Sequence, residues 1–88
     1  MPTIVITHNV VDVDRWLAGK AERAAVIGAF GTGVTDHVAL DGSNSVAITA
    51  DLDDLDGALA MMSAPDPEAA ATMERHGVLP PIAVYVVR

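Results

Sequence analysis

The stretch Thr3-Ile4-Val5-Ile6-Thr7-His8-Asn9 decides the fold, because it is typical of a β-strand whose two faces can both be buried. β-Branched side chains fit a packed, pleated surface. Alternation along the strand places Ile4 and Ile6 on one face, and the two threonines and the valine on the other. We therefore expect an interior strand, covered on two sides, that ends at His8 and Asn9.

Working outward from this strand, a helix is expected to follow directly. Asp12 is the expected N-cap, because a short acidic side chain can accept from the first free backbone N–H groups. Apolar residues then recur at helical spacing from Trp16 to Ile27, and the glycine-rich residues 28–33 end the helix. The polar, exposed face of this helix is expected to carry Arg15, Glu22 and Arg23.

Residues 34–41 and 45–52 alternate as the two strands of a hairpin across Gly42-Ser43-Asn44. Directly opposite residues in a hairpin point to the same face. A loop with an odd number of residues keeps bulky residues opposite each other, for example Val38 opposite Ile48, whereas an even loop mixes the faces. We therefore expect a three-residue loop.

A second helix is expected to open with Asp53 as its cap, to be interrupted at Ala64-Pro65 and to restart at Asp66-Pro67-Glu68. In that restart Asp66 is the N-cap and proline takes the first helical position. Arg75-His76-Gly77 ends the helix, with glycine as the C-cap. Residues 78–81 are expected to be a stiff connector, and residues 82–87 the last strand.

The chain has 88 residues and is expected to form a single domain over residues 1–88. Its net charge is −7, from 12 acidic and 5 basic residues, which argues against partners such as nucleic acid or an anionic membrane surface. Hydrophobic residues make up 51% of so small a chain, and this excess favours a homodimer that hides apolar surface. There is no cysteine, no recognisable signal peptide and no apolar run long enough to span a bilayer, so we expect a cytoplasmic protein.

With its β-α-β-β-α-β order, the chain resembles the dimeric α/β-barrel superfamily, which has a ferredoxin-like fold and includes the antibiotic-biosynthesis monooxygenases. The resemblance covers almost the whole chain. It rests on element order, size, the helix-opening Val-Asp-Arg-Trp-Leu at residues 13–17 and Met-Glu-Arg-His-Gly-Val at residues 73–78. It implies an α+β fold with an antiparallel four-stranded sheet in the order 4-1-3-2 and helices on one face. It also implies that two sheets pair into a barrel, with ligands bound between the sheet and the helices or loops.

The bulky strand faces, such as Ile4/Ile6 and Val46/Ile48, are expected to meet the helices, although Asp36 fits that face only near a sheet edge. Small apolar and hydroxyl side chains on the opposite face suit either a ligand cavity or a buried sheet–sheet interface of the dimer. Candidate catalytic residues are His37, Tyr85 and His76, which would orient a substrate or move a proton. Histidine exchanges protons near neutral pH. Candidate ligand-binding residues are Thr7, His8, Asn9, Thr35, Thr49 and Trp16.

No cofactor or metal is expected from the motifs of this chain. Residues 51–62 fail the calcium-loop pattern, and the three histidines lack metal-ligand spacing. Some haem-degrading members of the superfamily use an Asn late in the first strand, a Trp and a His near the end of the second helix. Asn9 and His76 roughly match those places, whereas Trp16 lies on the first helix and does not.

Three functions follow from these observations. The first is a homodimer with a pocket for a small, partly apolar organic ligand, acting as a cofactor-independent monooxygenase or isomerase-type enzyme. The second is a non-catalytic ligand-binding or assembly module, which the shortage of nucleophilic groups favours. The third is a haem-binding protein.

Overall fold

The computed structural model describes residues 2–64 and 66–87. Their order is the predicted β-α-β-β-α-β, except that the first predicted helix is divided into two segments; the second consists of two segments, as predicted. The elements are β1 (Thr3–Val10), α1 (Val13–Ala18), α2 (Lys20–Gly28), β2 (Gly31–Val38), β3 (Ser45–Leu52), α3 (Leu55–Ser63), α4 (Pro67–Arg75) and β4 (Val78–Val86).

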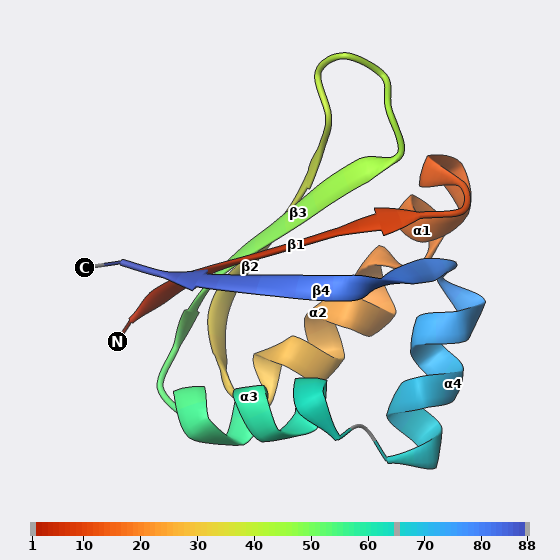
Figure 1. The fold of residues 1–88 in the computed structure, drawn as a ribbon. Coiled ribbons are helices and arrows are strands. Elements are labelled where there is room, and N and C mark those ends of the chain that lie inside the picture. Colours follow the sequence, from red (N-terminus) through yellow and green to blue (C-terminus); the bar gives the residue numbers. More distant parts are fainter. Residues whose placement is uncertain (1, 65, 88) are drawn as a thin grey trace.

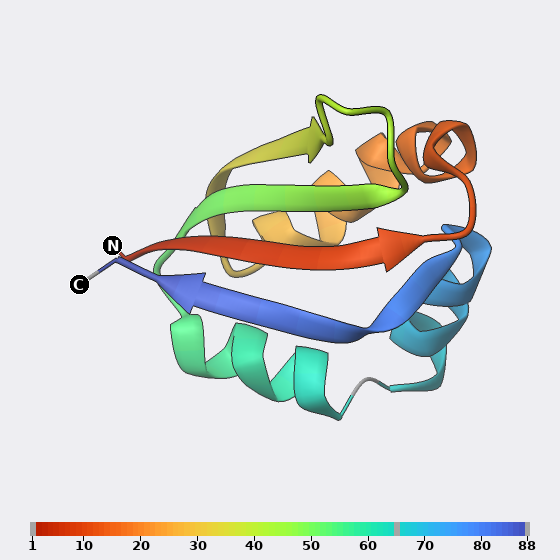
Figure 2. The ribbon, with the colours of Figure 1, turned by 45° about the horizontal axis from the view of Figure 1, so that its top comes forward.

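The four strands form one antiparallel sheet in the order β2-β3-β1-β4, which is the predicted order 4-1-3-2 written from the other edge. Figures 1 and 2 show β1 in the interior of the sheet and the helices gathered on one face. This is the ferredoxin-like α+β arrangement expected from the sequence, and it confirms the interior position of Thr3–Val10.

The core lies between the sheet and the helices. Along β1 the burial alternates strictly, so that Ile4, Ile6, His8 and Val10 face inward. The neighbouring strand β3 alternates in the same way, which confirms the predicted helix-facing side of both strands. The largest fully buried side chains are Trp16, Ile4, Leu52 and Val10.

The hairpin between β2 and β3 differs from the predicted three-residue loop. Val38 pairs with Val46 rather than with Ile48, so the loop is longer, although bulky residues still face bulky residues. The turn begins before the predicted loop, because the backbone N–H of Gly42, at φ +78°, donates to the Ala39 carbonyl oxygen. Asn44 is not free to pair with β2, since its carbonyl oxygen accepts from the Val10 N–H of β1 at 2.9 Å.

Three helix caps follow the chemistry that their sequences indicate. Asp12 accepts from the Asp14 N–H at 3.0 Å, and Asp66 caps α4 with proline in its first turn, both as predicted. The cap of α3 is Asp54 rather than Asp53. The reason is that the backbone N–H groups of both aspartates donate to the Phe30 carbonyl oxygen, which places the helix start one residue later.

Three further boundaries differ from expectation. β2 spans Gly31–Val38 instead of residues 34–41, so part of the glycine-rich stretch belongs to the strand. The first predicted helix breaks at Gly19, which both ends α1 and begins α2. The predicted connector 78–81 belongs to β4, because Val78 and Leu79 pair with Val10 and Asn9 before a register shift. The predicted interruption at Ala64-Pro65 includes Pro65, which lies outside the described residues; α3 ends at Ser63 and α4 begins at Pro67.

The outer face of the sheet is not covered by any helix of the described chain (Figures 1 and 2). No helix in residues 2–64 and 66–87 is both long and apolar enough to cross a membrane. The strand register aligns this face in two cross-sheet rows, namely Thr35–Thr49–Val5–Tyr85 and His37–Ala47–Thr7–Ala83.

Candidate functional site

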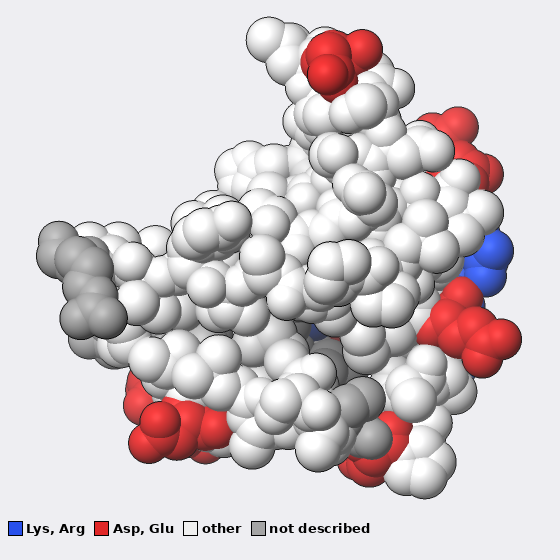
Figure 3. Space-filling model, viewed as in Figure 1, with Lys and Arg blue, Asp and Glu red and all other residues white. Residues whose placement is uncertain are grey.

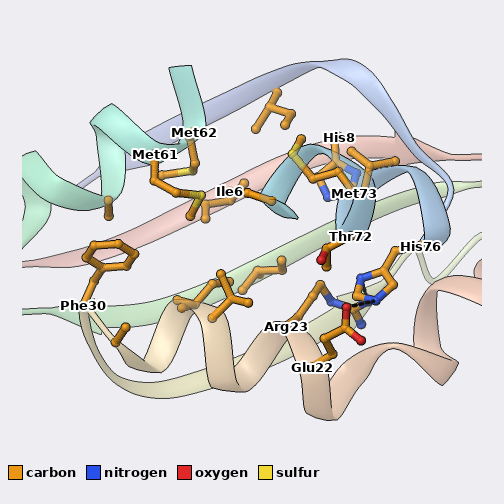
Figure 4. Close-up of a pocket in the computed structure, with 18 of the residues that line it drawn as sticks. Ile6, His8, Glu22, Arg23, Phe30, Met61, Met62, Thr72, Met73 and His76 are labelled. Atoms are coloured by element: carbon orange, nitrogen blue, oxygen red, sulfur yellow. Dashed lines mark hydrogen bonds and ion pairs between the residues drawn. The ribbon is translucent and has the colours of Figure 1, made fainter. Parts of the chain in front are cut away.

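A cavity of about 570 Å³ lies between the inner face of the sheet and α2, α3 and α4. Figure 4 shows that its two ends differ in chemistry. Phe30, Met61 and Met62 lie at one end, and the polar side chains gather at the other. The polar residues labelled there are His8, Glu22, Arg23, Thr72 and His76.

Arg23 is the central group of the polar end. It comes from α2 and is only 7% exposed. Its guanidinium lies over the Trp16 ring, 4.0 Å from the centroid, and donates to the Trp16 carbonyl oxygen. It also forms a 3.2 Å ion pair with Asp36 of β2, whose side chain is 3% exposed. The prediction that Arg23 lies on the exposed helix face is therefore wrong, because a buried carboxylate needs a cationic partner.

His76 lies at the C-terminal end of α4 and is buried. Its Nδ1 is 3.3 Å from a guanidinium nitrogen of Arg23, and its Nε2 is 3.7 Å from a carboxylate oxygen of Glu22. Since guanidinium only donates, these partners assign the hydrogen of His76 to Nε2. Burial lowers the pKa of His76, and the nearby positive charge of Arg23 lowers this pKa further.

Glycine at position 19 makes the placement of His76 possible. A Cβ at this position would overlap the imidazole ring, with Cε1 only 2.6 Å away. Beside the ring, Glu22 of α2 accepts from Arg75 of α4 and so joins the two helices at the edge of the cavity.

His8 reaches the polar end from β1. Its ring meets Trp16 edge-on, with the ring centroids 6.1 Å apart, and its Nδ1 is 3.0 Å from the Asn9 carbonyl oxygen. Burial lowers the pKa of His8 against the weaker opposing effect of the Asn9 hydrogen bond, and the charge of Arg23 lowers this pKa further. Both histidines of the cavity are therefore held in the neutral form near pH 7.

The sequence-predicted site residues separate onto two faces of the sheet. His8 and His76 line the cavity, and Trp16 lies beneath it, fully buried. Among the predicted catalytic residues, His37 and Tyr85 lie on the outer face and are not brought together with His76. The outer face also carries Thr7, Asn9, Thr35 and Thr49.

The outer face has a shallower hollow of about 440 Å³, lined by His37, Thr7, Asn9 and their neighbours. There His37 Nε2 lies 3.0 Å from the Thr49 hydroxyl oxygen. The small residues of the outer face suggested a ligand pocket there. The cavity on the other side of the sheet, against the helices, is larger than this hollow.

Sequence reasoning missed Arg23 and Asp36 as members of the site. One signal was present: Asp36 alternates with apolar residues on the strand face that meets the helices. An acid in that position requires a buried partner, and Arg23 of the helix that precedes this strand is that partner.

The residues present do not fit a haem site of the kind that Asn9 and His76 suggested. Asn9 points to the outer face, where its side-chain oxygen accepts from the Ser45 hydroxyl. Both ring nitrogens of His76 already face partners, and Gly19 lies against the ring. Within the described residues, no group of three or more His, Cys, Asp or Glu is arranged to hold a metal ion.

Comparison with known proteins supports the fold. The chain is similar to the crystal structure of a putative antibiotic biosynthesis monooxygenase from Deinococcus radiodurans, with a TM-score of 0.60 and 14% sequence identity. The match covers 97% of this chain and 90% of that one. No family model matches the chain, and no curated protein matches it. At this identity the likeness establishes the ferredoxin-like fold.

Proposed function

We propose that the protein binds a small, partly apolar organic molecule in the cavity between the sheet and the helices, and acts on it as a cofactor-independent monooxygenase or isomerase-type enzyme. The observation that carries this proposal is the division of the cavity into an apolar end and a polar end. Such a division holds the body of a ligand by contact and orients it through a few polar groups.

Two features favour catalysis. The neutral imidazole of His8 can accept a proton near pH 7, which is the first step in activating an acidic C–H or O–H group. An oxygenase without metal or flavin relies on an electron-rich substrate and needs no cofactor motif. The similar Deinococcus radiodurans protein, described as a putative monooxygenase, points to the same class of reaction.

The working unit that we propose is a homodimer joined through the outer face of the sheet. Figure 3 shows that the acidic and basic side chains visible from this side lie mainly at the rim of the molecule. The outer rows contain Val5, Ala47 and Ala83 together with threonines, and Tyr85 is 59% exposed. A second copy would cover this surface, and His37 and Tyr85 would then lie at the interface between the subunits.

A non-catalytic binding module is the second candidate. It is favoured by the pairing of polar groups within the site, since Arg23 is bound to Asp36 and Arg75 to Glu22. Charges engaged in this way serve the fold more readily than they serve chemistry.

The test combines native mass spectrometry of the purified protein with turnover assays on a panel of phenolic and enolic compounds. We expect a dimer, and product formation that Met62→Trp abolishes by filling the cavity. Leu59→Trp, on the exposed side of the same helix, is the matched control and should keep activity. Binding without turnover would favour the non-catalytic module, and undiminished turnover in Met62→Trp would place the active site elsewhere.

A further inference from the structure

We infer that His8 is the residue that anchors the ligand, and that it accepts a hydrogen bond at Nε2 from an uncharged, largely apolar molecule with a hydroxyl or N–H group. This inference rests on the proposed function, because it assumes that the cavity is the binding site. It adds the anchoring atom and the charge of the ligand.

The hydrogen-bond partner of His8 determines its tautomer. Its Nδ1 is 3.0 Å from the Asn9 carbonyl oxygen, and a carbonyl can only accept. The ring hydrogen therefore resides on Nδ1, and Nε2 carries the lone pair. The opposite assignment holds for His76, whose Nδ1 faces the guanidinium of Arg23. The two histidines of the cavity thus present opposite ring nitrogens as acceptors.

The surroundings of His8 keep its imidazole ring uncharged. The ring is 8% exposed and packs against Trp16 of α1. The charged and titratable groups around the polar end are Arg23 and Glu22 from α2, His76 and Arg75 from α4, and Asp36 of β2, which pairs with Arg23. Burial lowers the pKa of His8, the hydrogen bond to the Asn9 carbonyl oxygen opposes this, and the positive charge of Arg23 lowers the pKa further. A neutral imidazole with a free Nε2 is an acceptor.

Several other polar groups at this end are already engaged within the protein. Arg23 donates to Trp16, His76 and Asp36. The Thr72 hydroxyl donates to the Glu68 carbonyl oxygen and accepts from Arg75. Within the described residues, Nε2 of His8 has no hydrogen-bond partner, so it is an imidazole acceptor open to a ligand. Two buried N–H donors of the same cluster, Nε of Arg23 and Nε1 of Trp16, are also without a partner.

The paired charges of the cavity favour an uncharged ligand. The two arginines that line the cavity are each paired with a carboxylate, Arg23 with Asp36 and Arg75 with Glu22. An anionic ligand would find no unpaired cation among them, and burying an uncompensated charge is costly. An apolar body suits the Phe30, Met61 and Met62 end, and a single donor group suits His8.

The experiment uses three probes of similar shape: 2-naphthol, its methyl ether 2-methoxynaphthalene, and 2-naphthoate. Binding is measured by NMR titration of the 88-residue protein labelled with ¹⁵N. We expect 2-naphthol to bind about tenfold more tightly than the ether, since the ether leaves a buried acceptor without a partner. The carboxylate should bind more weakly than 2-naphthol.

The variant is His8→Phe, which keeps an aromatic ring against Trp16 but removes the acceptor. It should bind 2-naphthol and the ether equally. Ala25→Phe, at an exposed position of α2 that does not line the cavity, is the control and should keep the tenfold preference. In the unmutated protein, the ¹⁵N signal of His8 Nε2 should move on addition of 2-naphthol but not of the ether, a readout that does not depend on how well the variant folds.

The outcomes separate the two proposals. Equal binding of 2-naphthol and the ether by the unmutated protein, or an unmoved Nε2 signal, would overturn the role of His8 while leaving the cavity as a binding site. A preference that persists in His8→Phe would overturn it as well. If none of the probes shifts signals of cavity residues, the proposed function fails together with the inference.

Discussion

Arg23 lies over the indole ring of Trp16, with its guanidinium carbon 4.0 Å from the ring centroid, while the same side chain donates to the Trp16 carbonyl oxygen. Its second guanidinium nitrogen reaches Asp36 on the edge strand β2. One side chain therefore ties α1, α2 and the sheet together beneath the polar end of the cavity.

Removing this charge should destabilise the fold strongly. Arg23→Met leaves Asp36 buried without a partner, and we expect the free energy of unfolding to fall by about 3–5 kcal/mol. The double variant Arg23→Met/Asp36→Val should recover most of that loss, because it removes both charges and keeps the apolar volume. Urea denaturation of the two single variants and the double variant measures the coupling. Additive losses would show that the pair does not act as a unit.

The part of the fold that could be predicted from sequence is the part that local pattern determines. Strict alternation in β1 and β3 assigns the faces of both strands, and short acidic side chains at Asp12 and Asp66 mark the helix starts. The prediction that bulky residues lie opposite each other across the hairpin followed from the same alternation. Its exact register did not, since the turn at Gly42 and the bond from Asn44 to β1 involve specific loop geometry and a third strand.

The candidate site was less accessible from sequence because it depends on contacts between distant segments. His8 and His76 were both singled out, but alternation alone could not say that they share a cavity while His37 and Tyr85 face the other way. Arg23 resembles an ordinary exposed helical arginine in sequence. Only the packing of α2 against β2 places it opposite Asp36.

Gly19 should not tolerate even a methyl group. In Gly19→Ala the new Cβ would overlap the His76 ring, and overpacking of this kind costs about 1–3 kcal/mol. Backbone strain is not the cause, since φ at Gly19 is −89°. Gly28→Ala is the matched control, because a Cβ there meets nothing within 4 Å. Thermal unfolding should show a lower Tm for Gly19→Ala alone, and equal Tm values for both variants would contradict the close packing of His76 on Gly19.

Mild acid should weaken the fold through His8 and His76. The pKa of each is lower in the folded protein than the value of about 6.5 expected in the unfolded chain. As the pH falls below about 6.5, the unfolded state binds protons that the folded state does not, so the free energy of unfolding decreases. The limit for each histidine is about 1.4 kcal/mol per pH unit.

Urea denaturation at several pH values between 7.5 and 5.5 tests this pH dependence. The decrease should become shallower in His8→Phe and in His76→Gln, and shallowest when the two changes are combined. An unchanged slope in the combined variant would mean that other groups cause the loss of stability.

The outer face of the sheet offers a direct test of the proposed homodimer. Ala47 lies in the middle of the row His37–Ala47–Thr7–Ala83, and an arginine there would place a charge in the proposed interface. We expect Ala47→Arg to sediment as a monomer with unchanged circular dichroism, whereas Ala25→Arg, at an exposed position on α2, should remain a dimer. Charge burial at an interface is costly only where a partner covers it. A dimer that survives Ala47→Arg would therefore place the contact between subunits on another surface, and it would leave His37 and Tyr85 open to solvent.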